Sequence, residues 1–416
     1  MTSTIARKSL ALLAVAGLFV ICGVGFWNNI LLFPKLAQFF GIDASHARWI
    51  QALYSLGYIA FALPSALFHR KYGYKIGVIF ALGLVSVGPF LIYPAISVHG
   101  VAFFLVAVVL LGAGWSALET SLNSLAIEMG PPETAVRRLN FLQAFFPVGV
   151  VIGYVLGRWF YPSDLHLSFT VLAQEAARPY VVVGLAVLFL AFLFERVEFP
   201  ARLGIRTGGV AEGGTELRRL LADPAVMLGA AAIFCCIAIQ STLQGATYVY
   251  VMQQYPGFTY QLADNMVFVA LIVFGIGRFA GTALMGRFEA NRLYLLAVAA
   301  CLTLTLGALA LGGKAGLYCL TATNLCMGIG YPTVFATTVL RLRSAANVGA
   351  GVLVAASGLA GLVIPLAMNL LIDATSARTA LLMALPCFPV LLLYVRHALG
   401  HRRADAAAWD RRAANG

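Results

Sequence analysis

Long apolar runs recur along the whole chain, and they limit the possible fold more than any other feature of the sequence. Runs of about 20 residues, separated by short polar segments, extend from residue 10 to residue 398. A helix of that length crosses the ~30 Å hydrocarbon core of a bilayer at about 1.5 Å per residue. Within a bilayer every backbone polar group needs an internal partner, so only helices and closed barrels span it. The runs are continuous rather than alternating, and they therefore predict an all-α membrane protein with many spans.

Composition agrees with a membrane location. The 416 residues are 61% hydrophobic and only 11% charged, with a mean hydropathy of +0.89. A soluble domain of this length needs far more charge to cover its surface. The seven cysteines fall in apolar runs without C-x-x-C or zinc-type spacing, and no G-x-x-x-x-G-K-[S/T] or H-E-x-x-H motif occurs. We therefore expect no metal, no cofactor, no use of ATP and no enzymatic activity.

The apolar runs predict twelve membrane-spanning helices, none of which contains a histidine. The longest polar connection, 195–224, is rich in Gly and charge, carries no apolar period and divides the spans into two sets of six. We expect an N-terminal bundle over 1–194, a cytoplasmic linker over 195–224, a C-terminal bundle over 225–398 and a cytoplasmic tail over 399–416. The predicted spans are 10–33, 49–68, 76–95, 101–127, 140–161, 180–195, 225–250, 264–284, 293–311, 315–340, 348–371 and 379–398.

The Lys and Arg residues predict which side of the membrane each loop faces. With the N-terminus inside, 21 of the 28 cations lie in cytoplasmic segments, six lie outside and Arg278 lies within a span. Cytoplasmic loops of membrane proteins carry such an excess of positive charge, so both termini are expected in the cytoplasm. The formal charge of +12 then reflects topology and contact with anionic headgroups, not nucleic-acid binding.

Short basic loops follow the second predicted span of each half, HRKYGYKIG from residue 69 and GRFEANRLY from residue 286. They resemble the loop signature of the major facilitator superfamily. Within it, the chain most resembles the fucose–galactose–hexose proton symporters, and the stretches at 118–149, 275–288 and 328–339 carry this resemblance. The resemblance implies a cavity between two six-helix bundles that opens alternately to each side. It also implies a monosaccharide or similar small substrate moved with a proton, a functional monomer, and a bacterial inner membrane as its location.

Glu119 is the only carboxylate deep in a predicted span, in the stretch GAGWSALETSLNSLAIEMG (112–130). A charge in mid-membrane costs several kcal/mol, so such residues usually face a cavity and serve function. Burial favours the neutral form of a carboxylic acid, which brings proton exchange into the physiological range. The family's matching glutamate is implicated in proton coupling. We expect Glu119 to carry the proton and to bond a substrate hydroxyl; the alternative is a neutral acid that bonds a neighbouring helix.

Polar and aromatic residues on the predicted cavity helices are the expected substrate ligands. Trp115, Glu119 and Asn123 are spaced by four, so they share one helix face. The ring suits the C–H face of a sugar and the polar groups suit its hydroxyls. The alternative for Trp115 is contact with lipid or packing against another helix, and the alternative for the polar residues of the C-terminal half is hydrogen bonding between helices. The expected substrate ligands are Asn29, Trp115, Glu119, Asn123, Gln143, Gln240, Gln244, Tyr248, Asn324 and Tyr331.

Two positions depart from the cavity of the family that the chain resembles. Asn29 stands where the family has a proton-linked aspartate, and Phe146 stands where it has an asparagine. An amide bonds substrate but cannot carry a proton at neutral pH, so coupling would rest on Glu119 alone. Arg278 is a possible charge partner for Glu119; the alternative is that it reaches the cytoplasmic interface.

The sequence thus predicts a secondary active transporter, with proton-coupled monosaccharide uptake as the main hypothesis. The alternative is a proton-coupled exporter of a small polar metabolite, siderophore or drug, which the missing carboxylate at Asn29 keeps open. A membrane receptor or sensor would need a large soluble effector segment, and the tail HRRADAAAWDRRAANG is too short for one.

Overall fold

The computed structural model describes residues 2–42, 44–98, 100–160, 169–199, 210–254 and 260–414, and the regular structure in these ranges is entirely helical. The first helices are α1 (Thr2–Phe39), α2 (Ala44–Tyr72), α3 (Tyr74–Ser97), α4 (Val101–Glu128), α5 (Ala135–Gln143), α6 (Phe145–Phe160) and α7 (Phe169–Arg196). Those that follow are α8 (Val210–Ala222), α9 (Pro224–Gln254), α10 (Tyr260–Leu284), α11 (Ala290–Leu311), α12 (Gly313–Met327), α13 (Gly330–Arg341), α14 (Ala346–Ala374), α15 (Ala377–Ala380) and α16 (Cys387–Ala414).

Ten helical segments in the described part of the chain are long and apolar enough to cross a membrane. Large apolar side chains such as Leu13, Phe189 and Leu296 are more than half exposed on the outer faces. Apolar surface of this extent suits contact with lipid rather than with water. The predicted spans at 180–195, within α7, and at 315–340 are not among the ten. A multi-pass, all-helical membrane architecture is confirmed.

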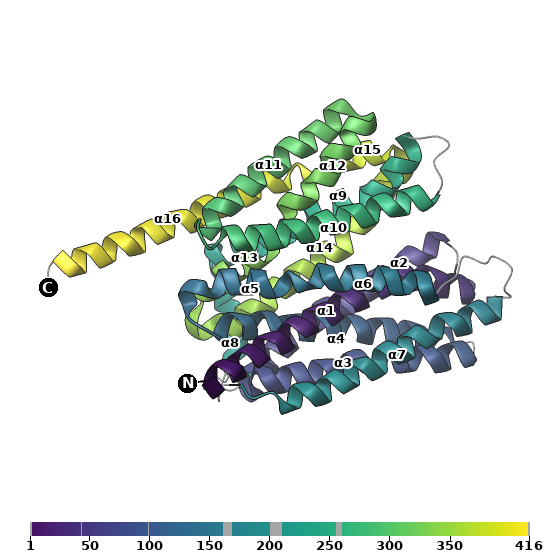
Figure 1. Ribbon diagram of the computed structural model, residues 1–416, viewed down its shortest axis with the longest axis horizontal. Coiled ribbons are helices and arrows are strands. Elements are labelled where there is room, and N and C mark those ends of the chain that lie inside the picture. The colour runs from purple at the N-terminus through teal and green to yellow at the C-terminus, as the bar shows by residue number, and fades with distance from the viewer. Residues whose placement is uncertain are drawn as a thin grey trace.

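The helices lie in two groups (Figure 1). One contains α1 to α7, and the other contains α9 to α16, with both chain termini toward the same end of the molecule. The groups meet where α2 packs along α14, and where α5 and α6 pack against α10 and α13. The candidate site described below is built at this meeting surface.

The predicted span 315–340 is not one helix, because α12 ends at Met327 and α13 begins at Gly330. Here α12 touches α10 backbone to backbone. A Cβ atom at Gly328 would lie 2.8 Å from the backbone nitrogen of Arg278, and one at Gly277 would lie 2.1 Å from the carbonyl oxygen of Leu325. Pro332, in the first turn of α13, has no N–H group to continue the earlier helix. The break turns backbone carbonyls toward α10.

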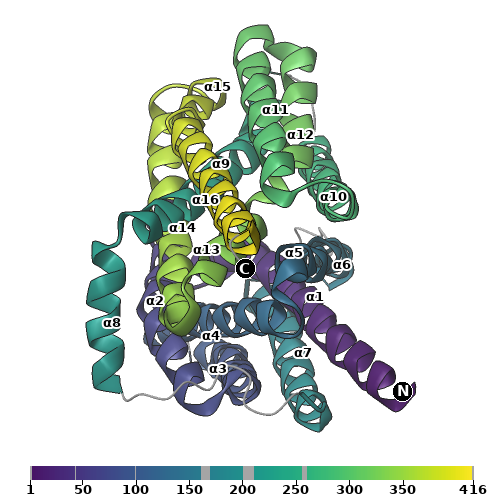
Figure 2. The ribbon, with the colours of Figure 1, turned by 90° about the vertical axis from the view of Figure 1, so that its left-hand side faces the viewer.

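The prediction of a linker without an apolar period was wrong, because 210–222 forms the amphipathic helix α8. Leu217 and Leu220 of α8 pack with Leu63 of α2 and Val348 of α14. Glu216 of α8 also forms an ion pair with Arg70 at the end of α2. Figure 2 shows α8 at the edge of the molecule, beside α2 and α14. The segment between the halves is therefore docked on both groups of helices.

The expectation that no span contains a histidine was also wrong, because His397 lies within the predicted span 379–398 and the candidate span within α2 contains a second one. α2 continues to Tyr72, which places His69 in the last part of this candidate span. The His69 side chain is 1% exposed, and its Nε2 atom lies 2.8 Å from the Ser121 hydroxyl of α4. The helix end was set too early because the apolar run stops before the basic residues that extend the helix.

Candidate functional site

Glu119 lies in the middle of α4, at the surface where the two groups of helices meet. The Tyr58 hydroxyl of α2 donates a hydrogen bond to Glu119 Oε2. Tyr331 of α13 bonds the same carboxyl group. The adjacent residues Leu118 and Thr120 are fully buried, so this part of α4 is enclosed by protein. The acid is thus held by one tyrosine from each group of helices.

A chain of amide side chains continues from this carboxyl group. Asn123 Nδ2 donates to the Tyr331 hydroxyl at 3.5 Å, and Gln143 Nε2 donates to Asn123 Oδ1 at 2.8 Å. Asn123, Gln143 and Tyr331 are each at least nine-tenths buried. Four residues singled out from the sequence, on α4, α5 and α13, are therefore brought into one hydrogen-bonded network.

Arg278 of α10 closes this network from the backbone side. Its Nε donates to the Gly328 carbonyl at 2.7 Å, and its Nη1 donates to the Gln143 carbonyl at 2.9 Å. Both carbonyls lie at the ends of helices, where they have no partner within the helix. Arg278 also interacts electrostatically with Glu119, but its hydrogen bonds go to carbonyls. The side chain is 5% exposed, so it is enclosed by protein.

Several nitrogen donors near α1 have no partner among the described residues. They are Asn28 Nδ2, Asn29 Nδ2 and Trp115 Nε1, in side chains that are 7–8% exposed. Tyr54 of α2 and Cys22 of α1 interact electrostatically with Glu119, which places this side of α1 next to the acid. A buried donor without an acceptor costs about 1–3 kcal/mol, so these groups are suited to a ligand oxygen.

A second group of predicted ligands lies on α9 and α12. Gln240 Nε2 donates to Gln244 Oε1 at 3.3 Å, and Gln244 Nε2 donates to Asn324 Oδ1 at 2.9 Å. Tyr248, one turn beyond Gln244, is half-buried. The structure thus joins three of the four C-terminal candidates on α9 and α12 in one hydrogen-bonded row.

Phe146 has an aromatic environment rather than a polar one. Its ring lies 5.6 Å from the Phe26 ring of α1, at an interplanar angle of 54°. Where the family that the chain resembles has an asparagine, this chain thus has an apolar contact between α1 and α6. This contact removes one hydrogen-bonding group from the wall of the site.

Further hydrogen bonds join the two groups of helices near the basic loops. Asn140 Nδ2 of α5 donates to Thr333 Oγ1 of α13 at 3.1 Å. The Tyr74 hydroxyl at the start of α3 donates to Asn347 Oδ1 at the start of α14 at 2.6 Å. With the ion pair of Glu216, these contacts fasten the end of the molecule that carries the loop at 70–75.

Comparison with known proteins identifies the fold. A model of the Major Facilitator Superfamily matches residues 15–365. The chain belongs to this superfamily. It is 29% identical over 405 residues to the L-fucose-proton symporter of Escherichia coli K12, across 92% of this chain and 91% of the relative. It is 30% identical over 401 residues to the L-fucose-proton symporter of Haemophilus influenzae, across 89% and 92%.

A further relative and a solved structure are also similar to this chain over most of its length. The glucose/galactose transporter of Brucella abortus is 26% identical over 402 residues, across 94% of this chain and 95% of the relative. The crystal structure of the transporter FucP in the outward conformation superimposes with a TM-score of 0.85 at 26% identity, covering 94% of this chain and 99% of that chain. The predicted resemblance is confirmed. The superfamily consists of transporters, not enzymes.

Sequence reasoning missed Tyr58, which contacts Glu119 directly. A signal was present, because Tyr54 and Tyr58 are spaced by four in the predicted span 49–68 and so share one helix face. Interpreting that spacing required knowing that α2 faces α4 and α14, which only the packing shows.

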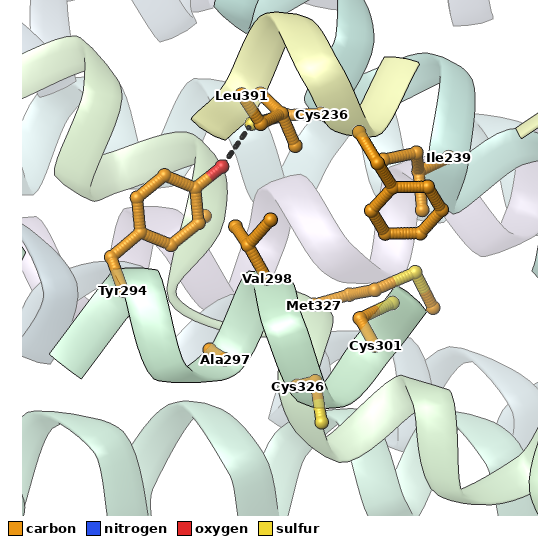
Figure 3. Close-up of a pocket in the computed structure, with 11 residues that line it drawn as sticks. Cys236, Ile239, Tyr294, Ala297, Val298, Cys301, Cys326, Met327 and Leu391 are labelled. Atoms are coloured by element: carbon orange, nitrogen blue, oxygen red, sulfur yellow. Dashed lines mark hydrogen bonds between the residues drawn. The ribbon is translucent and has the colours of Figure 1, made fainter. Parts of the chain in front are cut away.

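A separate small cavity lies between α9, α11, α12 and α16 (Figure 3). It is lined mainly by thiol and apolar side chains, and the Tyr294 hydroxyl lies 3.1 Å from Cys236 Sγ on its wall. Such a lining does not suit a hydrophilic substrate of a superfamily transporter. The candidate site therefore remains the network around Glu119.

Proposed function

We propose that this protein takes up a monosaccharide together with a proton by alternating access. The observation that carries the proposal is the carboxyl group of Glu119, in the middle of α4, held by Tyr58 and Tyr331 from opposite groups of helices. A group that contacts both halves can link its own protonation to their relative position. The relatives named as L-fucose-proton symporters and glucose/galactose transporters support the substrate class.

We propose Glu119 as the proton carrier, with the site residues divided between the halves. Asn29 and Trp115 offer unpartnered donors on one side, and Gln240, Gln244 and Asn324 offer amides on the other. Tyr248 adds an aromatic surface. Asn123, Gln143 and Tyr331 connect the carboxyl group to the meeting surface. Since Asn29 cannot carry a proton, one proton per substrate is the expected limit.

The topology belongs to the same proposal. Twelve spans form an N-terminal bundle over 1–194 and a C-terminal bundle over 225–398, joined by a cytoplasmic linker, in the inner membrane of a bacterium. Both termini and the tail over 399–416 are cytoplasmic, as the excess of basic residues in these segments supports. The functional unit is a monomer.

We also propose that the structure represents the outward-facing state. The bonds of Asn140 to Thr333 and of Tyr74 to Asn347 join the halves near the basic loops, the end assigned to the cytoplasm. The likeness to FucP in its outward conformation supports this assignment. The exporter alternative is not favoured, because the relatives named above are symporters and sugar transporters.

The test uses purified protein in proteoliposomes with an internal pH dye and a panel of monosaccharides. Wild type is compared with Glu119→Gln, and with Glu128→Gln at the end of the same helix as the matched control. We expect a sugar to drive proton entry in wild type and in Glu128→Gln, but not in Glu119→Gln. If no sugar moves protons in any of the three proteins, the uptake proposal is wrong.

A further inference from the structure

The Trp115 side chain reaches from α4 to α1 and lies directly on Gly25. A Cβ atom built on Gly25 would lie 2.2 Å from Cζ2, 2.7 Å from Cη2 and 3.2 Å from Cε2 of the indole. Real Cβ atoms do not approach other atoms this closely, so any side chain at this position would displace the ring. The contact involves the six-membered part of the indole, next to its Nε1 atom.

Gly25 is not explained by backbone geometry. It lies inside α1 and has no positive φ angle, so helix formation does not require glycine there. A glycine within a helix costs about 1 kcal/mol relative to alanine. Gly17, two turns earlier in α1, provides the contrast, because a Cβ atom there would meet nothing within 4 Å. The absence of a side chain at Gly25 therefore leaves the space that the Trp115 indole occupies.

The indole lies among groups that face the candidate site. Asn29 is one turn beyond Gly25 on the same face of α1, and its Nδ2 atom has no partner among the described residues. The Nε1 atom of Trp115 likewise has no partner among the described residues, although the side chain is buried, at 7% exposure. Glu119 follows Trp115 by one turn on α4. The position of the Trp115 indole thus determines where its N–H donor and its aromatic face lie relative to Glu119.

We propose that Gly25 is a positioning residue of the site, because the space left by its absent side chain holds the Trp115 indole in place for monosaccharide recognition. This inference rests on the proposed function, since it assumes that the cavity binds a sugar. A methyl group at Gly25 pushes the ring away from α1 and into the space beside Glu119. It thereby removes both the donor and the stacking surface from their places and leaves the proton carrier intact.

The transport test is a double-mutant cycle with L-fucose, D-galactose and D-glucose as probes. Trp115→Phe removes the ring atoms that a Cβ atom at Gly25 would strike. We expect Gly25→Ala to raise the half-saturating sugar concentration at least tenfold when Trp115 is present, and less than twofold when Trp115→Phe is present. Gly17→Ala, the matched control on the same helix, should remain within twofold of wild type.

A second measurement reports the position of the ring without substrate. The protein contains five tryptophans, so labelling with 5-fluorotryptophan gives a small set of ¹⁹F resonances, and Trp115→Phe identifies the signal of Trp115. We expect Gly25→Ala to shift that resonance and Gly17→Ala to leave it in place. The remaining signals also show whether each variant is folded.

The outcomes separate the two proposals. Equal effects of Gly25→Ala with and without the Trp115→Phe change, or an unshifted Trp115 resonance, overturn the role of Gly25 while uptake by wild type stands. If wild type transports none of the three sugars, the proposed function fails, and the role of Gly25 in sugar recognition fails with it.

Discussion

Replacing Arg278 by methionine tests whether its hydrogen bonds hold the two groups of helices together. The guanidinium group is buried and bridges the Gly328 carbonyl, within its own group, and the Gln143 carbonyl, across the meeting surface. Methionine fills a similar volume of apolar space but donates no hydrogen bond. Arg278→Met therefore leaves both carbonyl groups without this donor.

The magnitude follows from the two bonds. A hydrogen bond to a charged group contributes about 1.5–3 kcal/mol, so both together contribute about 3–6 kcal/mol to local stability. Only the bond to Gln143 joins α10 to α5 and opposes separation of the halves. Since 1.4 kcal/mol is a factor of ten, loss of that bond shifts the balance away from the closed end by roughly 10- to 150-fold.

The assay measures the distance between spin labels at Glu133 and Arg287, which are exposed on opposite sides of the meeting surface. We expect a population at longer distance in Arg278→Met. Arg378→Met is the matched control, because Arg378 donates to the Leu309 and Ala310 carbonyls within one group of helices. It should lower thermal stability without altering the distance. An unchanged distance distribution in Arg278→Met would refute the reasoning.

Three further predictions concern other contacts. Tyr58→Phe removes the hydroxyl that donates to the Glu119 carboxyl group. We expect proton-coupled uptake in proteoliposomes to fall about 10- to 150-fold, from a bond of about 1.5–3 kcal/mol, while the melting temperature changes little. Gly149→Ala places a Cβ atom 1.9 Å from a carbonyl oxygen of α1 and should destabilise the fold by about 1–3 kcal/mol. Gly83→Ala, with open space around it, should instead stabilise the fold by up to about 1 kcal/mol. Thermal unfolding followed by fluorescence distinguishes the two variants, and equal shifts in melting temperature would contradict the packing. Glu216→Gln weakens the docking of α8, because the part-buried, charge-assisted hydrogen bond from Arg70 contributes about 1.5–3 kcal/mol. Limited trypsin digestion should then cut at 218–219 at least about tenfold faster, and an unchanged cleavage rate would show that the apolar contacts suffice.

Local pattern was sufficient for the helical elements. Continuous apolar runs predicted the helices because a bilayer leaves the backbone no other partners, and the rarity of charge in those runs made Glu119 and Arg278 conspicuous. The hydropathy pattern did not predict the helix break at Gly328 or the helix α8, because contacts with other helices stabilise both. The break at Gly328 depends on the approach of α10, and α8 is stabilised by Leu63 and Val348, which are distant in sequence.

Hydropathy and residue type are local properties, so the amino-acid sequence was enough to predict a multi-span membrane protein and the polar residues within its spans, and the resemblance of its motifs added the prediction of transport. Which of these polar residues meet depends on the packing of the helices. Tyr58 bonds Glu119, Arg278 bonds carbonyls at helix ends, and Trp115 rests on Gly25. Each of these contacts joins residues at least 50 positions apart in sequence. Such partners depend on how whole helices pack against one another, which the spacing within any one helix does not specify.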